Sequence, residues 1–226
     1  SSGRLALAGA LTAAKAAALS GGPAEAFVGA SPERGDALIA TDGADPAELE
    51  RWAGAGGTVL ILSSEVARRL PGYAAANEEG LIYVGACGQG HPLLWGVSME
   101  SFMGVDHPCI EGVLTKIPPS ARVLLYGLSA RAGAARGGVS RKGNQQVGMF
   151  EEAKGPVAVF QPHGKGGWIV TTMTPWRGQT LFDGELMRTL FANAGVAIPI
   201  AGEEAGSVEV LKTVPLKIDG RLDDWT

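Results

Sequence analysis

The chain has 226 residues, of which 46% are hydrophobic and 19% are charged, and its formal net charge is −4 at neutral pH. This composition is that of an ordinary globular protein, with enough residues for one large domain or two small ones, and it excludes a disordered chain. The acidic balance argues against a nucleic-acid-binding surface, which is normally basic. No apolar run is as long as a membrane span.

Strands and helices alternate through the first 70 residues. The apolar run at 4–9 predicts a buried strand, and the alanine-rich segment after it predicts a helix, since Lys15 breaks any signal-peptide pattern. Further strands are predicted at 24–30, 36–43 and 58–63. Asp45 is predicted to cap a helix that starts at Pro46, and Ser63 or Ser64 to cap a shorter one. This alternation predicts an α/β domain with a mainly parallel sheet in a three-layer sandwich.

The remainder of the chain contains strand-like runs and one clear helix. Strands are predicted at 80–86, 112–117 and 121–128, and the basic, glycine-rich segment 129–146 is interpreted as an exposed loop. A hairpin is predicted from 156 to 173 with its turn at 163–166, followed by a helix at 181–195. The apolar face of that helix is expected to consist of Leu186, Leu190, Phe191 and Ala194, with Gly195 as its cap.

Four stretches, taken in order, carry a resemblance to a known superfamily. They are "GDALIATDGADPAELERWAGAGGTVLIL" (35–62), "HPLLWGVSMESF" (91–102), "PVAVFQPHGKGGWIVTT" (156–172) and "FANAGV" (191–196). Their order resembles class I glutamine amidotransferase-like domains, in the ThuA-like and β-galactosidase trimerisation-like forms attached to multidomain glycoside hydrolases. The resemblance covers most of residues 4–199. It implies a flavodoxin-like α/β/α sandwich that ends in a β-hairpin and a helix.

The last residues resemble a different kind of module. "LKIDGRLDDWT" (216–226) is similar to the first strand of family 9 carbohydrate-binding modules. The resemblances imply an α/β domain at 1–200, then a linker and the first strand of a truncated β-sandwich domain at 201–226. We expect the residues after about Gly202 either to be poorly anchored or to pair with a partner outside the 226 residues.

A working amidotransferase needs a nucleophilic cysteine on a strand-to-helix elbow, a histidine and a carboxylate. Cys87 follows an apolar run, but Gln89 stands where the elbow needs glycine, and the next residues do not have a helical pattern. His163 lies in "FQPHG", where Gly164 replaces the carboxylate that would fix its tautomer. We therefore predict a packed or loop thiol at Cys87 and a structural histidine at His163. Cys109 has no elbow at all.

Exposed aromatic side chains are the remaining binding signal, because sugars stack on exposed Trp. Trp95 and Trp176 follow predicted strands near loops, and Arg177 accompanies Trp176. They are candidate binding residues, although core or interdomain packing is the favoured interpretation. With no CxxC motif and three separated histidines, we expect no metal site, and no motif indicates a cofactor.

The leading hypothesis is a non-catalytic accessory domain of a carbohydrate-active enzyme. Its expected partners are other domains of the same polypeptide, a second copy in a homo-oligomer, or a carbohydrate, with no nucleic acid and no membrane. A secreted or periplasmic location follows from the resemblance. One alternative is a small hydrolase that uses Cys87 with His91 or His163. Another is a sugar-binding module that uses Trp176 and the loop 129–146.

Overall fold

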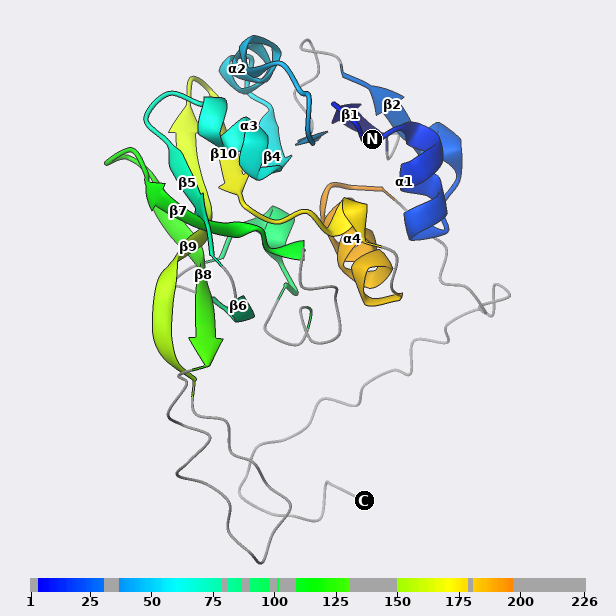
Figure 1. Cartoon of the computed structure of the whole chain (residues 1–226). Helices are drawn as coiled ribbons and strands as arrows, with labels where there is room; N and C mark the ends of the chain where they lie inside the picture. The colour runs from blue at the N-terminus through cyan, green and yellow to red at the C-terminus, as the bar shows by residue number, and fades with distance from the viewer. Residues whose placement is uncertain are drawn as a thin grey trace, which may run out of the picture.

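The computed structural model describes residues 4–30, 37–78, 81–86, 90–97, 101, 109–130, 150–178 and 181–196 (Figure 1). The strands are β1 (Leu5–Ala8), β2 (Phe27–Gly29), β3 (Ala37–Ala40), β4 (Thr58–Leu62), β5 (Ala74–Asn77), β6 (Leu81–Ala86), β7 (Gly112–Lys116), β8 (Arg122–Ala130), β9 (Phe150–His163) and β10 (Gly166–Thr171). The α-helices are α1 (Ala13–Ser20), α2 (Pro46–Gly54), α3 (Ser64–Arg69) and α4 (Leu181–Asn193). Short 3₁₀ helices include η1 (Ala24–Ala26), η2 (Pro92–Leu94) and η6 (Pro175–Arg177).

One mixed sheet forms the centre of the molecule. Its eight strands have the order β2-β1-β3-β4-β10-β9-β8-β6. The five strands from β2 to β10 in this order run parallel, whereas β9, β8 and β6 extend the sheet with antiparallel pairs. The prediction of an α/β domain with a mainly parallel sheet is therefore confirmed at this level.

The caps predicted from sequence begin their helices. The Asp45 carboxylate accepts a hydrogen bond from the Ala47 amide, at 3.1 Å, and Pro46 occupies the first helical position of α2. Of the two serines considered for α3, Ser63 is the cap, because its hydroxyl accepts from the Val66 amide at 3.1 Å. Each cap supplies a partner for a backbone N–H that the first turn of a helix leaves unsatisfied.

Both faces of the sheet are covered. Side chains alternate along a strand, so Leu5 and Leu7 of β1 join one buried cluster while Ala6 and Ala8 join the other. The first cluster includes residues of α1 and α4, and the second includes residues of α2 and α3, among them the fully buried Trp52. Figure 1 shows α1 beside α4. Leu186, Leu190 and Phe191 of α4 are buried as predicted.

The structure differs from the sequence prediction in several elements, and β5 was not predicted. The second predicted strand is shorter, because residues 24–26 form η1 before β2 begins at Phe27. The hairpin of β9 and β10 is present with its turn between His163 and Gly166, but β9 begins at Phe150 and pairs along β8 as well. The predicted strand at 112–117 is β7, which pairs with β5 in a separate two-stranded sheet. The differences at β9 and β7 arise from pairing with distant strands, which local patterns do not encode.

Some predictions fall on residues that the structure does not describe. Cys87 lies outside the described residues, as do the greater part of the loop 129–146 and the whole segment 201–226.

Candidate functional site

The carboxyl ends of the parallel strands form the natural place for a site in this fold. Strands β1, β3, β4 and β10 all end at the same edge of the sheet. The chain passes from β1 to β2 on one side and then to β3 on the other side of β1, so a switch point lies between β1 and β3. In open α/β sheets, ligands bind in the crevice outside such a switch point.

In this chain the loops after β1 and β3 are bonded to each other. The Ala10 amide donates to the Asp42 carbonyl at 2.8 Å, and the Leu11 amide donates to the Thr41 hydroxyl oxygen at 3.0 Å. Gly9 has a φ of +91°, and a Cβ at this position would overlap the carbonyl groups of Thr41 and Asp42. Two backbone amides at the switch point, those of Ala10 and Leu11, are thus already used within the protein.

Beside the switch point lies a polar group of side chains, here called the Arg177 cluster: Asp42, Ser63, Ser64, Glu111 and Arg177. Arg177 forms ion pairs with both Asp42 and Glu111. Ser63 donates to Asp42 at 2.5 Å, and Ser64 donates to Glu111. The cluster therefore joins the ends of β3 and β4 to η6 and to the residue before β7.

The surroundings of Arg177 in this cluster favour its positively charged form. Burial opposes the charged form of Arg177, but its hydrogen bonds and charge interactions with Asp42 and Glu111 outweigh this effect and raise the pKa of the guanidinium. The Arg177 side chain is 41% exposed, compared with 18% for Asp42 and 21% for Glu111. The cluster is thus a half-exposed, mutually satisfied ion network.

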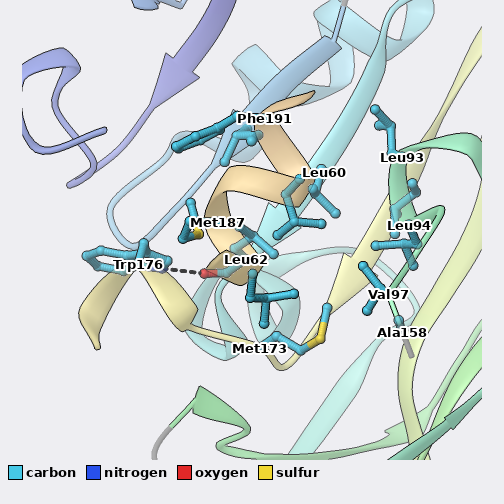
Figure 2. Packing of buried hydrophobic residues seen from close by; sticks show 14 of the residues in the cluster. Leu60, Leu62, Leu93, Leu94, Val97, Ala158, Met173, Trp176, Met187 and Phe191 are labelled. Carbon is cyan, nitrogen blue, oxygen red and sulfur yellow. Dashed lines mark hydrogen bonds between the residues drawn. The ribbon is translucent and has the colours of Figure 1, made fainter. Parts of the chain in front are cut away.

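Trp176, one of the candidate binding residues, lies in the core next to this cluster. Its side chain is 5% exposed, and its indole Nε1 donates to the Leu62 carbonyl at 2.8 Å (Figure 2). Lys15 Nζ lies 5.0 Å and Arg177 Cζ 5.2 Å from the indole ring centroid. Trp176 therefore packs as a core residue whose ring is bordered by two cations.

His163 lies at the opposite edge of the sheet. It forms the turn just before β10 begins, and the first residues of β10 pair with the start of β4. Its ring stacks on Trp168 at a centroid distance of 4.5 Å, and its Nε2 lies 3.7 Å from a Glu50 carboxylate oxygen. His163 and the Arg177 cluster therefore lie at opposite ends of the parallel strands.

Trp95 is the exposed candidate, with 80% of its surface accessible. It follows η2, and the loop is held to α4 because the Asn193 side-chain amide donates to the carbonyls of Leu93 and Trp95, at 3.2 and 2.7 Å. The indole is therefore presented from a backbone of fixed position.

Cys109 is buried and is not in a disulfide. Burial, with a smaller contribution from the Asp183 carboxylate, raises the pKa of its thiol well above the ordinary range. Such a thiol is unsuited to act as a nucleophile.

Sequence reasoning missed most of the Arg177 cluster as a group. The signal for Asp42 and Ser63 is a polar residue one or two positions after the end of a buried strand. The carboxyl ends of parallel strands lie at the same edge of a sheet, so such residues are brought together there. Glu111 carries no such signal, because only the tertiary fold brings it to Arg177 and Ser64.

Within the described ranges, no three His, Cys, Asp or Glu side chains gather closely enough to hold a metal ion. None of the described helices has both the length and the apolar character needed to cross a bilayer.

No protein-family model and no curated protein matches the chain. Among solved structures it is similar to a β-galactosidase from Rahnella sp. R3, with 14% identity over 79% of this chain and a TM-score of 0.40. It is also similar to the exo-β-1,4-mannosidase Op5Man5 from Opitutaceae bacterium strain TAV5, with 11% identity over 82% of this chain and a TM-score of 0.40. A third similar structure is α-L-fucosidase isoenzyme 2 from Paenibacillus thiaminolyticus, with 16% identity over 84% of this chain and a TM-score of 0.44. The similarity spans 25%, 30% and 32% of the length of these three chains, respectively.

Proposed function

We propose that this chain is a non-catalytic accessory domain of a carbohydrate-active enzyme, a glycoside hydrolase of the β-galactosidase type. It acts by packing against other domains of the same polypeptide and by joining copies in a homo-oligomer. In this proposal the α/β domain at 1–200 is a ThuA-like, flavodoxin-like sandwich, and the protein is secreted or periplasmic. The assignment to this class rests on the order of the four sequence stretches between residues 35 and 196.

The observation that carries the accessory role is the closed carboxyl edge of the sheet. At the switch point, the amides of Ala10 and Leu11 are bonded to the loop after β3. Next to it, the Arg177 cluster satisfies its own charges, because one guanidinium serves two carboxylates. An edge that is bonded internally supports a role in bracing the fold rather than in holding a substrate.

The residues at this edge also lack the arrangement of a nucleophilic site. Ser63 is the polar residue between β4 and α3, but its hydroxyl accepts from the Val66 amide and donates to Asp42. Its φ of −162° is ordinary extended backbone, unlike the strained turn of a nucleophile elbow. His163 lies at the other edge, and His91 uses its Nδ1 to accept from the Leu93 amide.

The competing hypothesis is a cysteine-dependent hydrolase, and turnover tests it directly. Glutaminase and p-nitrophenyl-ester hydrolysis are measured for the wild type, Cys87→Ala and Cys109→Ala. Under the accessory role all three proteins show the same background rate, since neither thiol takes part in a reaction. Turnover that disappears only in Cys87→Ala would overturn the proposal.

Thiol alkylation gives a second test. In Cys87→Ala the remaining thiol is Cys109, which we expect to resist iodoacetamide at neutral pH because burial raises its pKa. In Cys109→Ala the remaining thiol is Cys87, and we expect it to alkylate no faster than a cysteine in a short peptide. Alkylation of Cys87 that is faster than this reference at pH 7 would indicate an activated thiolate.

A further inference from the structure

Three side chains lie close together at a distance from the Arg177 cluster. They are Arg122 on β8, Phe160 on β9 and His91 at the start of η2. Arg122 and Phe160 are direct partners in the antiparallel register of β8 and β9, so both side chains lie on the same face of the sheet. The Arg122 Cζ lies 5.8 Å from the Phe160 ring centroid. The His91 ring lies 4.9 Å from the same centroid, tilted by 31°. Phe160 thus brings a guanidinium and an imidazole together.

The position of the Phe160 ring depends on a glycine. Gly167 of β10 lies beneath this ring, and a Cβ there would be 2.5 Å from the Phe160 Cε2 atom. Any larger residue at position 167 would displace the ring. The packing between β9 and β10 therefore fixes Phe160 where it can contact both His91 and Arg122.

The orientation of His91 leaves one hydrogen-bond donor. Its Nδ1 accepts from the Leu93 amide at 3.2 Å, which caps η2, so the neutral imidazole carries its proton on Nε2. Burial and the nearby Arg122 charge lower the pKa of His91, which keeps the ring neutral near pH 7. His91 can therefore donate from Nε2 while its cap remains intact.

The positive charge beside His91 has no acidic partner in the described part of the chain. Three other basic side chains in those ranges form ion pairs: Arg69 with Glu65, Lys154 with Glu78, and Arg177 with two carboxylates. Arg122 is exposed, and its neighbours are the Phe160 ring and His91. A planar guanidinium next to a neutral N–H donor matches the two oxygens of a carboxylate.

The Trp95 indole lies at the other end of the same 3₁₀ helix. A 3₁₀ helix rises about 2 Å per residue, so the backbone positions of His91 and Trp95 are separated by roughly 8 Å along η2, the scale of a monosaccharide. Trp95 is 80% exposed and its backbone carbonyl accepts from the Asn193 side-chain amide, so a flat apolar ring extends from an anchored stretch of backbone. The C–H face of a pyranose is the ligand surface that such a ring accommodates.

We propose that His91, Arg122 and Phe160 form a binding site for the carboxylate of an acidic sugar of the uronate class, with the pyranose ring on Trp95. The carboxylate preference rests on the geometry, whereas the choice of a sugar also rests on the proposed function. Its failure is separable from failure of the accessory role, because this site is tested by binding and the accessory role by turnover.

The test is a titration of the ¹⁵N-labelled chain with D-glucuronate, followed by amide chemical shifts. D-Glucose is the matched neutral sugar, acetate the carboxylate without a ring, and inorganic phosphate the alternative anion. We expect saturable binding of glucuronate in the millimolar range, weaker binding of acetate and no saturable binding of glucose.

Four variants assign the roles, with folding checked by circular dichroism. Arg122→Gln is expected to weaken glucuronate binding by about tenfold or more, since a charge-assisted hydrogen bond contributes at least that much. His91→Asn keeps an acceptor for the Leu93 amide but removes the Nε2–H, and it should weaken binding several-fold. Trp95→Ala is expected to reduce glucuronate affinity to the level of acetate. Arg51→Gln, on the exposed part of α2, is the control and should bind as the wild type does.

Four results would overturn the proposal. They are the absence of saturable glucuronate binding, unchanged affinity in Arg122→Gln, glucose binding as tight as glucuronate binding, and phosphate binding at least as tight as glucuronate binding.

Discussion

His91 performs two tasks that depend on its protonation state. Its Nδ1 caps η2, and its ring packs beside Phe160 near Arg122. Burial, and then Arg122, lower its pKa in the folded protein, whereas the unfolded chain has the ordinary value of about 6.5. Between these two values the unfolded state binds more protons. The stabilising effect of neutral His91 is therefore present above about pH 6.5 and is lost as the pH falls.

We predict that the free energy of unfolding decreases more steeply between pH 7 and pH 5 in the wild type than in His91→Asn. Urea denaturation at a series of pH values measures this difference, since asparagine keeps the capping acceptor but does not titrate. In Arg122→Gln the His91 pKa should rise toward its ordinary value, as followed by NMR titration of the ring. A wild-type His91 that titrates at or above 6.5 would contradict the assignment.

Residue roles were predictable from sequence where they depend on neighbours in the chain. Asp45 and Ser63 cap their helices through amides two and three residues away. Core packing was the favoured interpretation of Trp176, but its hydrogen-bond partner was not predictable, because the indole bonds to Leu62, which is 114 residues distant. The same reason explains why Glu111 was missed: its partners Ser64 and Arg177 are 47 and 66 residues away.

At the scale of elements, η6 is a brace between strands of both sheets that are distant in sequence. Its Arg177 joins the end of β3 to the residue before β7, and its Trp176 bonds to the end of β4 (Figure 2). The two carboxylates would repel each other without the guanidinium. The Arg177 ion pairs are half-exposed, however, so solvent screening reduces the contribution of each to well below that of a buried pair.

We predict that Arg177→Met lowers the free energy of unfolding by about 1–2 kcal/mol, because two partly exposed ion pairs are lost and two carboxylates are left together. Methionine retains the apolar part of the side chain beside Trp176. Chemical denaturation measures the change, and Arg51→Met, at an exposed position on α2, should change it by less than about 0.5 kcal/mol. The Arg177→Met effect should shrink in 1 M NaCl, where charges are screened. An effect equal to that of Arg51→Met would show that the cluster does not brace the fold.

Element types followed from sequence better than element pairings did. The alternation through β4 and the apolar face of α4 are local patterns, and the structure contains them. The placement of β7 outside the main sheet, and the extension of β9 along β8, depend on which distant strand offers a partner. Strand pairing of this kind is decided by tertiary packing, so periodicity alone does not predict it.

At the scale of the whole molecule, two buried clusters on opposite faces of the sheet supply the core. Within the described residues, the last member of either cluster is Val196, which follows α4. Helix α4 is essential to one face, because Leu186, Met187, Leu190 and Phe191 are all buried there. Figure 2 shows Met187 and Phe191 of this helix facing Leu60 and Leu62 of β4.

We therefore predict that a chain ending at residue 200 keeps the stability of the full 226 residues, within about 0.5 kcal/mol in urea denaturation and with the same m-value. The two described clusters remain complete in it, and burial of apolar side chains is the main source of folding free energy.

A chain ending at residue 180 lacks α4 and should not fold cooperatively, because the loss of four large buried side chains exceeds the net stability of a typical domain. Circular dichroism and urea titration of the three chains measure these outcomes. If the chain ending at 200 lost more than about 1 kcal/mol, residues 201–226 would have to pack on the α/β body, and the proposed boundary between a domain at 1–200 and a second module would be wrong.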